Sequence, residues 1–273
     1  MLITAERPTA LQIASRAWTS LFQALRQMAP LFLCCLLLQS ALVVFGIWLL
    51  YQNPWIDWTH RASDWLPGFW TPIPITAALR DILTLFFIAP LAVAVHRSIL
   101  LGEVPKTPFF LNRTTLRFTA WLLVFEFASL FGAALSPWTA TAIGWLFNLG
   151  YAVVACWVLL AFPAIAVGES AKTGRLATAI RRARGNFWLI AGALLLTIFV
   201  LIALSRGFDI AYDAFMRDFL RNQQFHFPGG LTSFPGISWI YMLLSNCIQL
   251  AMVALSAATA SWLYSYAAYR TVS

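Results

Sequence analysis

An acidic side chain, Glu126, lies near the middle of a long apolar stretch of the sequence. The stretch extends from Arg117 to Ser136, and the residues around the acid, Trp121–Phe127, are otherwise all apolar. A charged carboxylate at the centre of a bilayer costs about 2.5–3.5 kcal/mol on insertion scales. If this stretch crosses a membrane, the carboxyl group must be neutral, be paired or lie beside water.

Two interpretations of Glu126 are open. In the functional one, the carboxyl group handles a proton or a substrate during transport. In the structural one, it is protonated and joins helices through hydrogen bonds, because Asn148 and Gln249 fall at a comparable depth in other apolar stretches. The sequence shows no second acid or histidine at this depth, so Glu126 alone would make a poor proton relay. This favours the structural interpretation.

No other residue pattern indicates catalysis, a metal or a cofactor. The sequence has no phosphate-binding glycine loop, no HExxH and no GxSxG motif, and its histidines and acids match no ligand spacing. The neighbours His96 and Arg97 mark the end of an apolar stretch, where contact with lipid headgroups is a simpler interpretation than catalysis. We therefore predict no catalytic residue, no metal site and no cofactor.

The composition predicts that these residues are positioned by a membrane protein. The chain is 61% hydrophobic and 10% charged, whereas soluble domains are about 25% charged. Its apolar stretches are near or above the ~17–25 residues that a spanning helix needs, and a spanning backbone must pair its own polar groups. We predict an all-α polytopic fold, a single membrane domain over residues 1–273 in which residues 29–273 form the transmembrane bundle. The six predicted spans are Pro30–Tyr51, Ile75–Leu100, Phe118–Leu135, Thr139–Val167, Phe187–Leu204 and Ile237–Tyr266.

The distribution of charge predicts the orientation in the membrane. Thirteen of the 18 Lys and Arg residues fall in the N-terminal segment, the second and fourth loops and the tail, and five fall on the opposite side. The positive-inside rule then places both termini in the cytoplasm. Because the formal charge of +8 lies in short loops beside apolar stretches, we read it as contact with anionic lipid of the cytoplasmic leaflet and expect no nucleic-acid partner.

Amphipathic helices are predicted beside the spans. Within residues 1–28, apolar residues recur at helical spacing from Leu11 to Leu25, which is typical of a helix lying in the headgroup plane. A shorter stripe, Leu176 to Ala183, lies among basic residues, and aromatic residues from Phe208 to Phe219 predict a surface helix after the fifth span. The residues that we expect to contact lipid headgroups are Arg97, Arg175, Arg181, Arg182 and Arg184.

Two segments of the chain are similar to each other. Ala89–Val95 is followed by Gly102-Glu103, and Phe162–Val167 is followed directly by Gly168-Glu169. Each is an apolar helix with a proline that leaves the membrane through Gly-Glu into a basic loop. We interpret the similarity as parallel repeats of a two-helix hairpin, although any hairpin between basic loops would show some of these features.

Leu91–Glu103 and the segments Pro163–Glu169 and Ala179–Trp188 resemble uncharacterised six-span bacterial inner-membrane proteins. The likeness is to the YciC-like group and to the membrane domain attached to some glycerophosphodiester phosphodiesterases. The pattern Gly185-Asn186-Phe187-Trp188 at the entrance of a span is its most specific part. The resemblance implies an inner-membrane location and topology. It implies no activity, because the chain has no soluble phosphodiesterase domain.

Together these features predict a non-enzymatic integral protein of the bacterial inner membrane. We expect it to associate with anionic lipids, with another membrane protein or with a second copy of itself. One alternative is a transporter or permease component that uses Glu126. A second is a lipid-processing membrane enzyme, which would need polar residues clustered at one interface.

Overall fold

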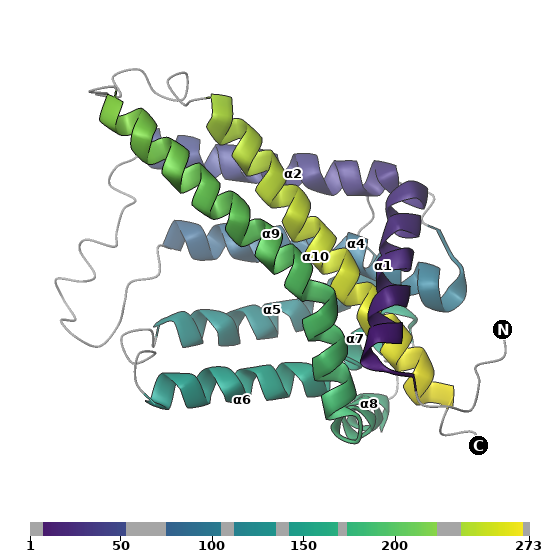
Figure 1. The fold of residues 1–273 in the computed structure, drawn as a ribbon. Coiled ribbons are helices and arrows are strands. Elements are labelled where there is room, and N and C mark those ends of the chain that lie inside the picture. The colour runs from purple at the N-terminus through teal and green to yellow at the C-terminus, as the bar shows by residue number, and fades with distance from the viewer. Residues whose placement is uncertain are drawn as a thin grey trace.

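The computed structural model describes residues 8–52, 75–104, 112–134, 142–168, 174–222 and 236–269, and these are helical apart from short connections. The element order confirms the all-α prediction for this part of the chain. Figure 1 shows several long helices lying side by side and the N-terminal helix crossing them near one end. The helices are α1 (Ala10–Gln27), α2 (Ala29–Gln52), α4 (Ile75–Leu101), α5 (Arg113–Ala134), α6 (Ala142–Val158), α7 (Ala161–Ala166), α8 (Gly174–Arg184), α9 (Phe187–Asn222) and α10 (Gly236–Tyr269).

Five helical stretches in the described residues are long and apolar enough to cross a membrane. They lie in α2, α4, α6 with α7, α9 and α10. A multi-pass membrane protein accounts for them, since each can satisfy its backbone groups without water. The remaining predicted span, Phe118–Leu135, coincides with most of α5, but residues beyond Ala134 and some α5 side chains lie outside the described part. The sixth span therefore stays a prediction.

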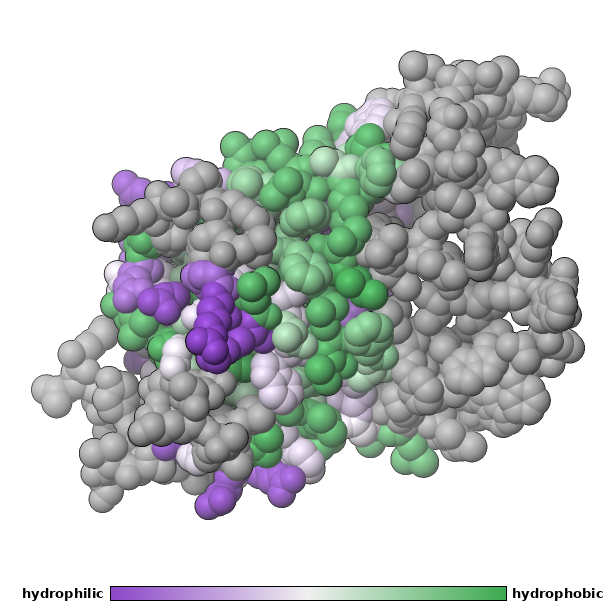
Figure 2. Space-filling view, turned by 180° about the vertical axis from the view of Figure 1, so that it is seen from behind, coloured by the Kyte–Doolittle hydropathy of each residue, from purple (hydrophilic) through white to green (hydrophobic). Residues whose placement is uncertain are grey.

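Figure 2 shows how polarity is distributed over one face of the bundle. A broad apolar band crosses the middle, and hydrophilic residues gather on one side of it. We call this side the basic end; it holds α8, the end of α4 and the start of α5. The arginines of the basic end are Arg97, Arg113, Arg117, Arg181, Arg182 and Arg184. The start of α1, the end of α10 and the short helix α7 lie at this end as well (Figure 1).

Helix α1 is the predicted N-terminal amphipathic helix, and Thr9 caps it through a reciprocal pair of hydrogen bonds with Gln12. Its buried face is formed by Ile13, Ala17, Leu21 and Ala24, which pack mainly on α9 and α10. Leu11 and Phe22, which the sequence placed on the membrane-facing stripe, are 68% and 65% exposed. The helix therefore uses one apolar strip for the bundle and leaves another free for lipid.

The two proline-containing spans behave differently. Pro90 lies inside α4, which continues without interruption to Leu101. Pro163 lies in the short α7, and the helix before it ends at Val158, so the apolar stretch within the predicted span Thr139–Val167 is divided between two helices instead of forming one. A proline at position 163 cannot donate to the carbonyl of residue 159, and its ring crowds that carbonyl. The chain turns at Leu159 and Leu160, where Phe162 N–H donates to the Leu159 carbonyl at 3.3 Å.

The Gly-Glu segments that suggested a repeat share one backbone feature. Gly102 and Gly168 have φ of +68° and +79°, the left-handed conformation in which glycine commonly ends helices. After α4, Gly102 N–H donates to the Ser98 carbonyl at 3.1 Å, the single bond of the αL motif at helix ends. The shared helix ending accounts for the local similarity, and the larger hairpin repeat stays a prediction.

The fifth span and the surface helix predicted after it are one element. Helix α9 continues from Phe187 to Asn222, a length of about 54 Å, well beyond the ~30 Å hydrocarbon core. Away from the basic end, α9 and α10 stay together: the rings of Tyr212 and Tyr241 stack with centroids 4.1 Å apart, and Tyr241 donates to Asp209 at 2.6 Å. The separate surface helix expected from Phe208 to Phe219 is therefore wrong.

Candidate functional site

A buried histidine, His96, lies near the basic end of α4. Its side chain is 1% exposed, and its Nδ1 lies 2.8 Å from the hydroxyl oxygen of Ser261 on α10. The Ser261 hydroxyl donates to the Ala257 carbonyl at 2.9 Å, which uses its single proton. The tautomer that fits both contacts has His96 Nδ1–H donating to Ser261, which leaves the lone pair of Nε2 available as an acceptor. No described residue is a hydrogen-bond partner of that second nitrogen.

This burial corrects the prediction that His96 contacts lipid headgroups. The ring packs against Phe118 of α5, with ring centroids 5.7 Å apart, and Phe118 packs on Phe162 of α7 at 5.0 Å. The sequence places His96 five residues before the end of α4, but it does not reveal which way the side chain points. Its neighbour Arg97 points elsewhere, because successive residues of a helix lie about 100° apart around its axis.

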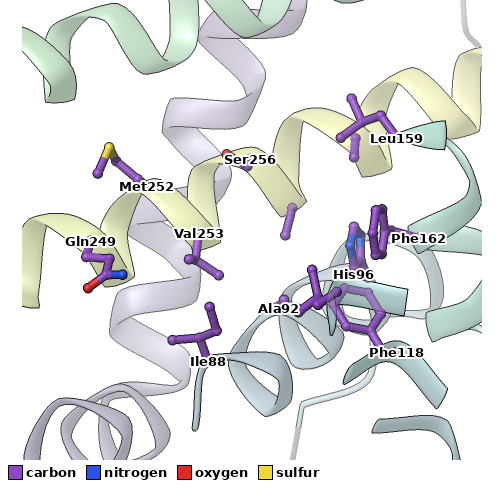
Figure 3. A pocket seen from close by; sticks show the side chains of 13 residues that line it. Ile88, Ala92, His96, Phe118, Leu159, Phe162, Gln249, Met252, Val253 and Ser256 are labelled. Atoms are coloured by element: carbon purple, nitrogen blue, oxygen red, sulfur yellow. The ribbon is translucent and has the colours of Figure 1, made fainter. Parts of the chain in front are cut away.

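His96 lines a cavity of about 300 Å³ between α4, α5, α7 and α10. Figure 3 shows the labelled side chains arranged along α10, from Gln249 and Met252 at one end to the group of His96, Phe118 and Phe162 at the other. Most of the lining is apolar, and the polar side chains in it are His96, Gln249 and Ser256. The volume is at the lower limit of small-molecule sites, which are typically mostly apolar with a few placed polar groups.

Gln249 does not bond Glu126, the partner that the sequence suggested. It accepts a hydrogen bond from Gln39 of α2, and three residues earlier on α10 Asn246 donates to Ser40 at 3.0 Å. Gln39, Ser40 and Asn246 are buried. The sequence analysis missed this pair of contacts, although the adjacent polar residues Gln39 and Ser40 in the middle of an apolar span were a readable signal.

Helix α10 also makes polar contacts with two other helices. Thr259 lies 3.4 Å from Thr197 of α9, hydroxyl to hydroxyl, and Trp262 donates to Ser20 of α1 at 3.0 Å. Small residues of α10, Ala254, Ala257, Ala258, Ala260 and Ser261, are buried within the chain. These small residues therefore serve packing between helices of the same chain.

Glu126 is half-buried on α5, and the structure brings a second acid near it. Asp81 of α4 and Tyr151 of α6 lie within electrostatic reach of its carboxyl group. The Tyr151 hydroxyl is 3.5 Å from the backbone carbonyl of Phe125. Asn148, the other predicted partner, is in α6 one turn before Tyr151, but its side chain lies outside the described residues. Glu126 is thus not the isolated acid that the sequence analysis assumed.

The predicted headgroup arginines differ in their surroundings. Arg97 pairs with Glu103 and donates to the Ala166 carbonyl at 3.1 Å, so it ties the ends of α4 and α7 together. Arg181 and Arg184 are exposed, Arg182 is half-buried, and the Arg184 guanidinium lies 4.6 Å from the ring centre of Trp157. Arg175 is in α8, and its side chain lies outside the described residues.

No group of three histidine, cysteine, aspartate or glutamate side chains in the described residues could hold a metal ion. A comparison of the chain with family models, with curated proteins and with solved structures finds no match. Its function therefore has to be inferred from its own residues.

Proposed function

We propose that this chain is a non-enzymatic integral protein of the bacterial inner membrane whose basic end associates with anionic lipid. The main support for the proposal is that basic and aromatic side chains are exposed together on α8 and at the start of α9. Arg181 and Arg184 are exposed there, and Trp188, four residues after Arg184, is 83% exposed. Exposed tryptophan is typical of the membrane interface, and each cation beside an anionic leaflet contributes about 1 kcal/mol.

The proposal includes a topology of six spans with both termini in the cytoplasm. It is supported by the arginines gathered at the basic end, where α1 begins and α10 ends (Figure 1), and by the resemblance to six-span inner-membrane proteins. Reporter fusions after Gly185 and at the C-terminus are expected to report cytoplasm, and fusions near Asp64 and Gln223 the outer side. A cytoplasmic signal near Asp64 would contradict the six-span topology.

The lipid association is tested by changing Arg181, Arg182 and Arg184 together to Gln. Native mass spectrometry of the purified protein is expected to show less retained anionic lipid, while circular dichroism shows an unchanged helix content. Arg206 is the matched control, because it lies on α9 away from the basic end and its side chain is 78% exposed. Equal retention in the triple variant, the Arg206→Gln variant and the parent chain would contradict the proposal.

A transport component is the second candidate, and the observation that favours it is the electrostatic coupling of Glu126 to Asp81. Coupled acids titrate together, whereas an amide cannot release a proton. Against it, the cavity beside His96 includes Leu122, one turn before Glu126, but not Glu126 itself, and it is mainly apolar.

Glu126→Gln distinguishes the two candidates. If Glu126 is structural, the amide keeps a hydrogen-bonding group in place, and both the free energy of unfolding and the cellular phenotype stay close to those of the parent. A folded Glu126→Gln protein with the phenotype of a complete deletion would make transport the better account. Asp81→Asn is the paired variant, because a shared proton requires both acids and would make the two phenotypes alike.

A further inference from the structure

We propose that the cavity beside His96 binds an amphiphile with one apolar chain and a hydroxyl donor at its end. The site is separate from the exposed arginines of α8, and the inference does not depend on lipid retention there. Its occupant is identified by two properties of the cavity: the shape and chemistry of the lining, and the unpartnered nitrogen at one end.

The shape of the cavity suits a single chain. Its lining on α10 extends from Gln249 to Ala260, which corresponds to about 16 Å of helix. This is close to half of the ~30 Å hydrocarbon core, the depth of one leaflet. Figure 3 shows the apolar side chains of Ile88 and Val253 between the two ends. An apolar chain that enters the cavity from this leaflet would exchange contacts with lipid chains for contacts with a mostly apolar lining.

The side of the cavity is accessible along part of its length. Leu122, Val253 and Ser256 are only half-buried, and Gln249 is exposed on the bundle surface. A chain could therefore enter from the lipid without passing through water or unfolding a helix. Gln249 already accepts from Gln39, so it is engaged within the bundle.

His96 lies at the end of the cavity opposite Gln249, and it is the polar group that would determine which occupant binds. His96 is 1% exposed, its Nδ1–H is donated to Ser261, and Nε2 has no partner among the described residues. The His96 ring lines the cavity, where Nε2 can accept a hydrogen bond from an occupant, and polar groups in apolar surroundings are nearly always paired. A hydroxyl group at the end of an apolar chain would supply the donor. A water molecule would meet few other polar groups in this lining, whereas buried waters typically make about three hydrogen bonds.

The test uses the full chain in lipid nanodiscs and a photoreactive long-chain alcohol. Labelled peptides are identified by mass spectrometry, with 1-dodecanol and 1-methoxydodecane as competitors. The ether has the same apolar chain but no donor. We expect labelling at cavity residues such as Phe118 and Val253, and competition by the alcohol that is roughly threefold to tenfold stronger than by the ether, the range of one hydrogen bond.

Two variants test separately the contribution of His96 Nε2 and the contribution of the cavity volume to binding. His96→Asn keeps an amide near the Nδ1 position for Ser261 but removes the acceptor at Nε2, so alcohol and ether should compete equally while labelling persists. Val253→Phe fills the cavity without touching His96, so labelling of Phe118 should fall for every probe. Circular dichroism and thermal unfolding are used to check that both variants are folded.

Labelling spread evenly over the lipid-facing surface would overturn the proposal, as would equal competition by alcohol and ether in the parent chain. If the parent behaves as expected, competition by dodecanoic acid and by monododecanoylglycerol distinguishes a protonated fatty acid from an acylglycerol as the source of the hydroxyl. Failure of this test leaves the arginine experiment on α8 unaffected, so the two proposals can fail separately.

Discussion

Two parts of the bundle are held together by different means. Around α10, polar side chains connect α10 to α1, α2, α4 and α9: Trp262 with Ser20, Asn246 with Ser40, Ser261 with His96 and Thr259 with Thr197. Around α5 and α7, the described contacts are mainly aromatic, with Phe162 packed on Phe118 and Phe125 at 5.0 and 5.7 Å.

The hydrogen-bonded part of the bundle is expected to hold its helices in one arrangement, and the aromatic part is expected to tolerate small movements. A hydrogen bond between helices fixes their rotation and register, because it forms only over a narrow range of distance and angle. Ring contacts in apolar surroundings tolerate small shifts. The cavity lies at the boundary between the two parts, with α4 and α10 on one side and α5 and α7 on the other. One wall is therefore fixed, and the other can adjust to an occupant.

The largest expected effect comes from removing packing in the α10 part. Leu255 is fully buried there, and Leu255→Ala should lower the free energy of unfolding by about 2–5 kcal/mol. The measurement is unfolding in mixed micelles with increasing SDS, followed by circular dichroism. Leu195→Ala on α9 is the control, because Leu195 is 67% exposed and should change stability little. Equal losses in the two variants would mean that α10 is not the packed centre of the bundle.

An intermediate effect is expected from the polar link between α2 and α10. Asn246→Leu leaves the buried Ser40 hydroxyl without its donor and should cost about 0.6–2 kcal/mol. Combined with Ser40→Ala, the loss should be smaller than the sum of the two single losses, since both variants break the same contact. Strict additivity in this double-mutant cycle would show that the pair does not interact.

The smallest effect is expected in the aromatic part. Phe162→Leu removes the ring contacts with Phe118 and Phe125 but keeps an apolar side chain, and should cost about 0.5–1.5 kcal/mol. Photolabelling of the cavity should change more than stability does, because Phe162 lines it. A loss as large as that of Leu255→Ala would contradict the view that this wall is the adaptable one.

The positions of the helices could be predicted from the sequence because a backbone in a bilayer has few alternatives to helix. α2 and α4 match the predicted spans to within one residue at each end. The rotation of each helix was difficult to predict, since α2 is apolar on every side except at the adjacent pair Gln39 and Ser40, and two residues mark a buried face less clearly than a full stripe does. This is why Gln39 was missed as the partner of Gln249 and His96 was expected at the surface.

The interruption of the helix between α6 and α7 could also not be predicted from the sequence. Pro90 and Pro163 sit in similar apolar segments, yet α4 continues through its proline and α6 ends before the other. Proline removes one backbone donor in both cases. Whether the helix bends or breaks depends on what packs around it, and here Phe162 lies between Phe118 and Phe125 of α5. Such contacts between distant segments are not encoded in local spacing.

The docking of α1 has a consequence for the order in which the protein matures. Helix α1 is synthesised before its main neighbours, α9 and α10, and the contact between Ser20 and Trp262 joins residues 242 positions apart in the chain. Until α9 and α10 have been made, the buried strip of α1 lacks its main partners in the bundle and can lie on the membrane surface. Closure of α1 onto α9 and α10 would then be a late step of assembly. A chain truncated before α10 would leave α1 on the lipid, with its buried strip accessible to proteases and quality control.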